Sequence, residues 1–195
     1  MAGSPKTAYR RLNNLKSLGL INQTRGRFNI KSGVISQPIN VLSRVVDSLI
    51  ALKQARRFGK YYDKRDIKLA KENVDYKFIT LDYKAWELTK FQYPSDLYLY
   101  VKDQNDAAMH LKKQGFSEGR KGHIIILPEL GNFQNEIERV YLDCIANDGR
   151  SKLDAVAIEM LYGDRITIKG RFTIEDFRKV SEELRIRKHA TSIVR

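Results

Sequence analysis

Apolar positions at helical spacing mark the opening of the chain. They form a single stripe at Ala8, Leu12, Leu15 and Leu18. A repeat of three to four residues predicts an amphipathic helix. Ser4 suits the N-cap of this helix, Pro5 its first helical position and Gly19 its C-terminal end. We therefore expect one helix between Ser4 and Gly19.

Two short strands are predicted after this helix, with a basic turn between them. Leu20–Thr24 forms the first strand and Phe28–Ile30 the second, and Arg25-Gly26-Arg27 separates them. Gly33 and Pro38 then indicate a connection to the next element.

A longer apolar stripe predicts a second helix over Ile39–Phe58. Its members are Val41, Leu42, Val45, Leu49 and Leu52. The stripe suits either a core against the next domain or a dimer seam. Residues 53–62 are basic with interleaved aromatics, so they either contact DNA phosphates or form a solvated helix end. Residues 63–74 predict a further, mostly charged helix.

The pattern changes from Tyr76 onward. Leu97–Val101 and His123–Leu127 are short apolar runs that predict strands, the second of them buried on both faces. Helices are expected over 103–114, 135–146 and 151–162, and a last one begins after Thr173, which pairs with Asp176 as a cap.

Some boundaries stay open at this point. Lys77–Leu81 is either a strand or the start of a helix, and Ser151 with Asp154 resembles a capping box. The order of elements predicts an α+β fold with a small sheet in a mixed α/β domain. We divide the chain into an N-terminal segment over 1–38, linking helices over 39–75 and a C-terminal domain over 76–195.

Charge is distributed unevenly along these segments. The chain of 195 residues has a net charge of +13. Residues 1–35 contain seven basic and no acidic residues, and residues 36–72 contain nine basic and four acidic ones. The remaining 123 residues are nearly neutral, with 20 basic and 19 acidic side chains. A basic N-terminal third indicates a polyanionic partner.

The N-terminal pattern fits double-stranded DNA as that partner. A helix, a strand, a basic turn and a second strand follow one another in the order of a recognition helix and a wing. Cations and amides on the helix suit base edges and phosphates, and the turn places arginines over the backbone or in the minor groove. The candidate DNA-binding residues are Lys6, Thr7, Arg10, Arg11, Asn14, Arg25 and Arg27.

The segment SPKTAYRRLNNLKSLGLI, within Ser4–Ile30, resembles winged-helix transcriptional regulators of bacteria and archaea. That family has two helices before the recognition helix, and here the helix begins at residue 4. Either the chain is a fragment or a downstream element replaces them. A lone helix and hairpin bury too little surface to fold alone, so we expect them to pack on the following helix or on a second protomer. We expect a homodimer.

A second resemblance covers residues 83–161. The sequence here resembles the C-terminal domain of AbiEi-family antitoxins and related archaeal regulators, in Arg120-Lys121-Gly122 before the apolar strand, Val140-Tyr141-Leu142-Asp143, Gly149-Arg150 and Asp154-Ala155. The resemblance implies a winged-helix autorepressor in a type IV toxin–antitoxin system, which opposes a cognate toxin without binding it stably.

No constellation of catalytic residues is found in the sequence. Glycine-rich phosphate loops are absent, and the three histidines have no metal spacing, so we expect no cofactor, no metal and no enzyme activity. We interpret His123 and the single Cys144 as structural. The acidic residues Glu136, Glu138, Asp143, Asp148 and Asp154 are interpreted as the exposed faces of two helices.

Two other functions remain open. The C-terminal domain is a protein-interaction module or antitoxin in one of them. In the other the chain binds RNA, with bases stacked on Tyr9, Phe58, Tyr61 and Tyr62. The sequence contains neither a signal-peptide pattern nor an apolar run of membrane-spanning length, so we expect a cytoplasmic protein without a membrane partner.

Overall fold

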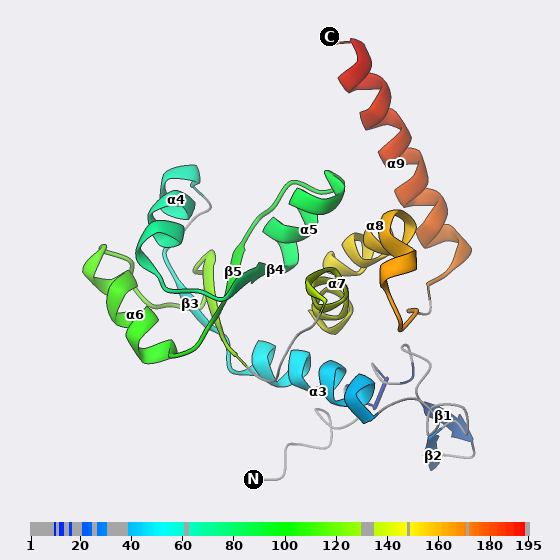
Figure 1. Cartoon of the computed structure of the whole chain (residues 1–195), viewed down its shortest axis with the longest axis horizontal. Coiled ribbons are helices and arrows are strands. Elements are labelled where there is room, and N and C mark those ends of the chain that lie inside the picture. The colour runs from blue at the N-terminus through cyan, green and yellow to red at the C-terminus, as the bar shows by residue number, and fades with distance from the viewer. Residues whose placement is uncertain are drawn as a thin grey trace.

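The computed structural model describes residues 10, 12, 13, 16, 21–24, 27–30, 39–60, 63–129, 135–147, 149–170 and 172–193. In this part of the chain, helices cover both faces of a small mixed sheet (Figure 1). The fold is therefore the mixed α+β fold that the order of elements predicts.

Four strands form the main sheet in the order β3-β6-β5-β4. They are β3 (Arg56–Phe58), β6 (Ile124–Pro128), β5 (Leu97–Val101) and β4 (Phe78–Thr80). The central strands β5 and β6 run parallel, and each outer strand is antiparallel to its neighbour. Helix α6 (Gln104–Lys113) makes the crossover that two parallel strands require.

Alternation along the central strands gives the sheet two apolar faces. Leu97 and Leu99 belong to a core with α6 and α4 (Lys64–Asn73), whereas Tyr98 and Tyr100 belong to a core on the other face. All five residues of β5 are buried. Because both faces are covered, the strands are continuous apolar runs, as the sequence indicates.

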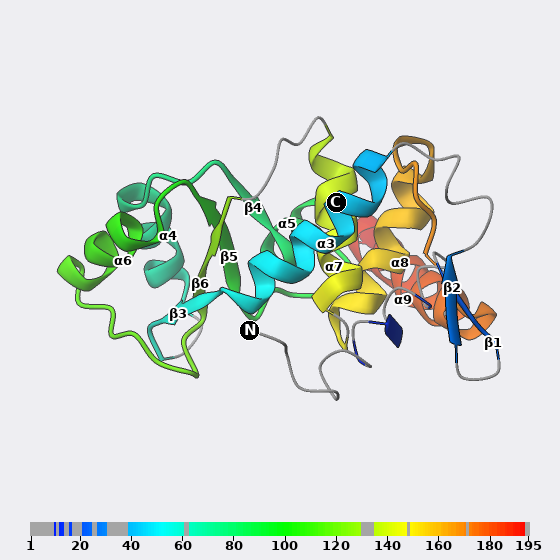
Figure 2. The same ribbon diagram turned by 90° about the horizontal axis from the view of Figure 1, so that it is seen from below.

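The second face of the sheet is covered by several helices, which lie beside one another in Figure 2. They are α3 (Ile39–Lys53), α5 (Leu81–Thr89) and α7 (Glu136–Asn147), and α8 (Ser151–Tyr162) packs on α5 and α7. Helix α7 contacts α3, α5 and α8, so it is buried on nearly every side. The interpretation of α3 as a core helix is thereby confirmed for Ala51 and its neighbour Leu52.

The predicted helix over 39–58 is wrong at its C-terminal end. Helix α3 ends at Lys53, and Arg56–Phe58 forms β3, which pairs with Ile124–Ile126 of β6. Phe58 is fully buried in the core on the α4 side. A strand of three residues is too short to show a period, and pairing with a distant strand outweighs the helical pattern.

The ambiguous segment before Trp86 contains both a strand and a helix. Phe78–Thr80 pairs with β5, and α5 begins at the next residue. Leu81 at the junction has φ of 53°, a left-handed conformation that is uncommon for a residue with a side chain. Its side chain is fully buried, so packing holds this conformation in place.

The C-terminal helices confirm one capping prediction and correct another. Thr173 and Asp176 cap each other's backbone amides before α9 (Ile174–Ile193), with donor–acceptor distances of 2.9 and 3.1 Å. Ser151 is the first residue of α8 and not its cap, and its hydroxyl accepts a hydrogen bond from Asn147 (2.9 Å). A short 3-10 helix (Gly163–Arg165) follows α8. Figure 1 shows the end of α9 extending away from the other helices.

A separate hairpin precedes these elements. Strand β1 (Ile21–Thr24) is antiparallel to β2 (Arg27–Ile30), with Ile21 opposite Ile30 and Thr24 opposite Arg27. The two predicted strands before the connection are therefore confirmed. Figure 2 shows the hairpin near α8 and α9, at the end of the molecule opposite α6.

Candidate nucleic-acid interface

The described residues before the hairpin are helical, as the apolar stripe predicts. Arg10, Leu12, Asn13 and Lys16 have helical conformation. Arg10 and Asn13 are exposed and three positions apart, so they share one side of the helix. Leu12 is half-buried and packs against the main apolar core. The helix thus has one side on the protein and one side in solvent.

The hairpin is linked to this helix by a side-chain contact. Lys16 Nζ donates to Gln23 Oε1 over 3.3 Å, and both side chains are exposed. The register pairs Thr24 with Arg27, so only Arg25 and Gly26 connect the two strands in the sequence. Two-residue connections that contain glycine are typical of tight hairpins.

Both parts of the N-terminal unit are anchored on the body of the protein. Ile21 is 6% exposed and belongs, with Leu12, to the core that contains Ala51 of α3 and Ile158 of α8. This packing confirms the expectation that the helix and hairpin do not stand alone. It also fixes which side of the unit is turned outward.

The predicted DNA-binding residues are described only in part. Arg10 is exposed on the helix, as predicted, and the backbone of Arg27 lies in β2. The others, Lys6, Thr7, Arg11, Asn14 and Arg25, lie outside the described residues. Asn13 and Lys16 are also exposed polar residues of this helix, and the set of predicted DNA-binding residues does not contain them. The spacing of three between Arg10 and Asn13 is a signal that could have identified the first.

Two of the four basic residues in the stretch at 53–62 are paired with acidic residues of the protein. Arg56 forms an ion pair with Glu118 over 2.8 Å, and Arg57 lies 3.4 Å from Asp96 and donates to the carbonyl of Gly122. The hydrogen bond from Arg56 lowers the pKa of Glu118 to about 2. These two arginines hold the loop at 117–122 against β3, so they are engaged in the fold.

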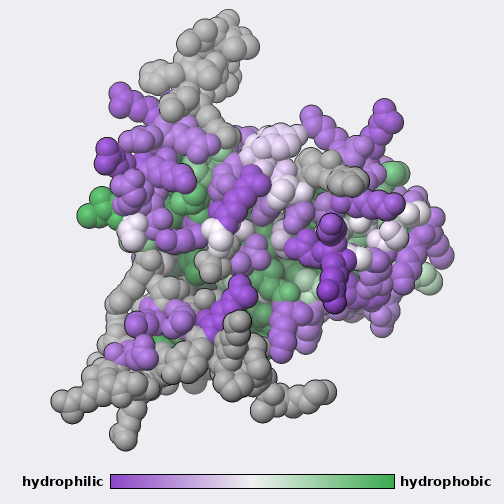
Figure 3. Space-filling model, turned by 180° about the vertical axis from the view of Figure 1, so that it is seen from behind, coloured by the Kyte–Doolittle hydropathy of each residue, from purple (hydrophilic) through white to green (hydrophobic). Residues whose placement is uncertain are grey.

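The RNA hypothesis is wrong in using Phe58 as a base-stacking residue, because its side chain is fully buried. The other aromatics of that hypothesis, Tyr9, Tyr61 and Tyr62, lie outside the described residues. In Figure 3, hydrophilic side chains in purple cover most of the described part of the visible face, with green apolar side chains between them.

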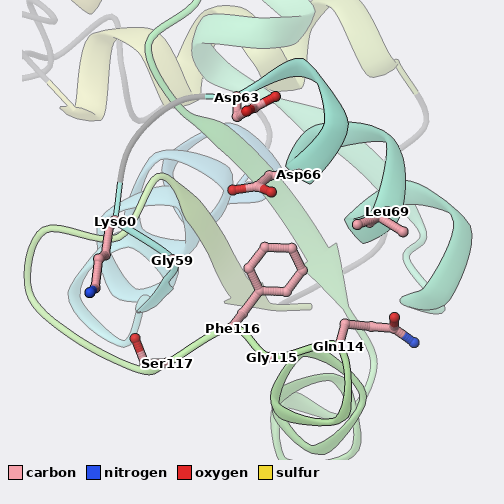
Figure 4. A pocket seen from close by; sticks show the side chains of 9 residues that line it. All are labelled: Gly59, Lys60, Asp63, Asp66, Leu69, Gln114, Gly115, Phe116 and Ser117. Carbon is pink, nitrogen blue, oxygen red and sulfur yellow. The ribbon is translucent and has the colours of Figure 1, made fainter.

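A hollow of about 370 Å³ lies between the start of α4, the segment before it and the loop after α6 (Figure 4). Its polar side chains are those of Lys60, Asp63, Asp66, Gln114 and Ser117. Asp63 caps α4 by accepting from the amide of Arg65 over 2.7 Å. Asp66 lies 3.4 Å from the buried His123. Both carboxylates thus have structural roles.

His123 is structural, as its position at a strand end predicts. It is 2% exposed, and a Cβ at Gly59 would lie 2.7 Å from its ring, so only glycine fits above it. Burial lowers the pKa of His123, and the charge of Asp66 opposes that shift. Among the residues that the structure describes, no group of histidine, cysteine and carboxylate side chains could hold a metal ion.

The interpretation of the acidic residues of α7 and α8 as exposed is wrong for three of them. Glu138, Asp143 and Asp154 are 3%, 0% and 2% exposed. Each has a partner inside the protein, which explains the burial. Asp148 lies outside the described residues, and Glu136 forms an ion pair with Lys84 over 3.3 Å.

Asp143 is the centre of a buried polar network between α7 and the sheet. It lies 3.0 Å from Arg139 Nε, and it accepts hydrogen bonds from Thr80 (2.6 Å) and Tyr100 (3.0 Å). Burial raises the pKa of Asp143, whereas Arg139 lowers it. The adjacent Cys144 is also fully buried, which confirms it as a structural thiol. The network lies inside the core and fixes α7 on β4 and β5.

The structure therefore defines a mixed α+β protein with a helix–hairpin unit anchored at one end. A scan against protein-family models and searches of the curated proteins and of solved structures find no match to this chain. Over the described residues, the helices lack the length and apolar character that crossing a membrane requires.

Proposed function

We propose that this chain is a sequence-specific DNA-binding regulator that represses its own gene, and that it contacts duplex DNA with the helix and hairpin at its N-terminus. The single observation behind the proposal is the orientation of the helix. Leu12 and Ile21 are held in the core, while Arg10 and Asn13 share an exposed side.

The chemistry of that exposed side suits a major groove. Arginine can donate two hydrogen bonds to guanine, and asparagine can donate one hydrogen bond to adenine and accept another from it. The acid-free sequence over residues 1–35 adds attraction to phosphates without local repulsion. The hairpin turn, with Arg25 and Arg27 on either side of Gly26, is the part that would contact the backbone beside the groove.

Binding of the full chain to duplex DNA from upstream of its own gene tests the proposal. Fluorescence anisotropy is expected to show an affinity that falls steeply as the salt concentration rises. Each neutralised phosphate makes the slope of log affinity against log salt concentration steeper by about 0.9. Arg10→Ala is expected to weaken binding about tenfold and to relax sequence preference, as the loss of one base contact does.

Lys113→Ala is the matched control for this variant. It also removes one exposed positive charge, and it lies in α6 at the opposite end of the molecule (Figure 2). Equal effects of Arg10→Ala and Lys113→Ala would overturn the assignment of the interface, and the absence of any duplex binding would overturn the function. Sedimentation at micromolar concentration tests the homodimer that a two-fold operator requires.

A further inference from the structure

A second hollow, far from the hairpin in sequence, combines aromatic rings with lysines. It has a volume of about 330 Å³ and lies between α4, α5 and the loop that joins α5 to β5. Its walls are formed by Lys64, Ile67, Tyr83, Trp86, Tyr93 and Pro94. Ligand pockets start at about this size.

The aromatic rings in this hollow are not stacked face to face on one another. Trp86 and Tyr93 meet edge to face, with centroids 5.8 Å apart, and Tyr83 is tilted by 59° against Trp86 at 6.3 Å. Tyr93 is 50% exposed, and the other two rings are half-buried. Aromatic surface therefore remains accessible to a planar ligand.

The loop that carries Tyr93 is anchored on both sides of it. Phe91 is 1% exposed, and Arg150 donates to the side chain of Gln92 over 2.7 Å and to the carbonyl of Tyr93. Ser95 donates to Asp82 over 2.6 Å. The exposure of the Tyr93 ring is thus imposed by a fixed backbone, which lowers the entropy lost when a ligand stacks on it.

Positive charge surrounds the rings. Lys64 lines the hollow, Lys71 Nζ lies 4.9 Å from the Tyr83 centroid and Lys90 Nζ lies 3.9 Å from the Trp86 centroid. Lys64 and Lys71 form no ion pair with a described carboxylate within 4.0 Å.

The acidic residues of the same elements are engaged elsewhere. Glu72 pairs with Lys68 over 3.8 Å, and Glu87 with Lys84 over 3.5 Å. Asp63 and Asp66 line the other hollow (Figure 4). The aromatic hollow consequently attracts anions.

We propose that this hollow binds a mononucleotide, with its base stacked on the exposed ring of Tyr93, the edge of the base against Trp86 and its phosphate near Lys64. Stacking accepts any base, and lysine binds phosphate as a point charge. The lysines disfavour a quaternary ammonium ligand, and a proline-rich peptide would leave their charge unused. The proposal is independent of DNA binding by the N-terminal unit.

Trp86 is the only tryptophan in the chain and reports directly on this hollow. Its fluorescence in the full chain is titrated with adenosine and guanosine monophosphate, with adenosine, and with inorganic phosphate. Both nucleotides are expected to quench the emission to saturation, adenosine more weakly, and inorganic phosphate not at all. Calorimetry with the same nucleotides gives a second measurement that does not depend on the tryptophan.

Two variants separate the parts of the site. Tyr93→Ala keeps Trp86 and is expected to weaken nucleotide affinity about tenfold, because a stacking surface is lost. Lys64→Gln is expected to weaken binding of the nucleotide and not of adenosine. Met109→Ala and Lys113→Gln are matched controls at exposed positions of α6, and neither is expected to change binding.

Absence of saturable binding by any mononucleotide in both measurements would overturn the proposal. It would also be overturned if a single-stranded oligonucleotide or a proline-rich peptide bound in a Tyr93-dependent way while mononucleotides did not. Arg10→Ala is expected to leave the titration unchanged, so failure of this proposal is distinguishable from failure of DNA binding.

Discussion

Several charged side chains of α7 and α8 are buried, although the sequence pattern of these helices predicts that their acidic residues are exposed. The interior of α7 and α8 contains Glu138, Arg139, Asp143 and Asp154. Each is stable there because a partner replaces water, as Thr80, Tyr100 and Arg139 do around Asp143. Removal of one partner would leave a buried charge uncompensated, which is costly.

Asp154 is a buried acid whose contribution to stability depends on pH. Burial and the nearby charge of Asp82 raise its pKa to about 7, while Arg150 and Gln92 lower it. Between about pH 4 and 7 the folded protein therefore holds a proton that the unfolded chain has released. The resulting stability is fully present below about pH 4 and is lost as the pH rises through the pKa of the folded state.

Asp154→Asn replaces the carboxylic acid by an amide of similar shape that stays uncharged at every pH. We expect it to increase the free energy of unfolding relative to wild type, by an amount that grows between about pH 4 and 7 and is constant above. Urea denaturation across this range measures the difference. Asp164→Asn, at an exposed carboxylate, controls for the loss of one negative charge. A difference independent of pH would contradict the prediction.

Among the elements, strand β3 is held by contacts with residues distant in sequence. It pairs with β6 and is covered by the loop after α6, which donates from Gly119 to the carbonyl of Arg57 over 2.9 Å. A Cβ at Gly122 would lie 2.4 Å from the backbone nitrogen of Phe58. The glycine of the Arg120-Lys121-Gly122 motif is thus explained by close approach of two backbone segments.

Gly122→Ala is expected to destabilise the protein by about 3 kcal/mol or more, because backbone atoms cannot move aside as a flexible side chain can. Gly119→Ala, three residues earlier in the same loop, has no heavy atom within 4 Å of the added Cβ and is expected to change stability little. Thermal unfolding of both variants measures the contrast. Equal losses of stability in the two variants would contradict the close backbone contact between Gly122 and β3.

For the whole molecule, the N-terminal unit and the body share one apolar core. Ile21 of the hairpin is buried in the same cluster as Ala51, Leu142 and Ile158. Residues far apart in the sequence therefore unfold together if the cluster is one cooperative unit.

Ile21→Ala is expected to lower the free energy of unfolding of the whole chain by about 2–4 kcal/mol, as truncation of a buried isoleucine does. The tryptophan emission of Trp86, at a distance from the hairpin in sequence, is expected to report the same shift in midpoint. Gln23→Ala changes an exposed residue of the same strand and serves as control. A shift seen only near the hairpin would show that the two parts unfold independently.

The elements that the sequence predicted correctly are those that depend on interactions between residues close together in the chain. The continuous apolar runs of β5 and β6, the helix between them and the cap formed by Thr173 and Asp176 depend on neighbouring residues, and the sequence predicted them. At the candidate interface it predicted the exposed Arg10 and the hairpin that contains Arg27, and it left the exposed Asn13 out of the DNA-binding residues.

The sequence by itself determined the α+β class, most element boundaries and the concentration of positive charge in the first third, because spacing, caps and charge are properties of a local segment. Only the tertiary structure decided that Arg56–Phe58 is a strand, that Asp143 and Asp154 are buried and that Leu12 and Ile21 join the main core. It also brought Lys64, Trp86 and Tyr93 to one hollow. These outcomes depend on residues distant along the chain, and their free energy is gained only when separate elements pack together.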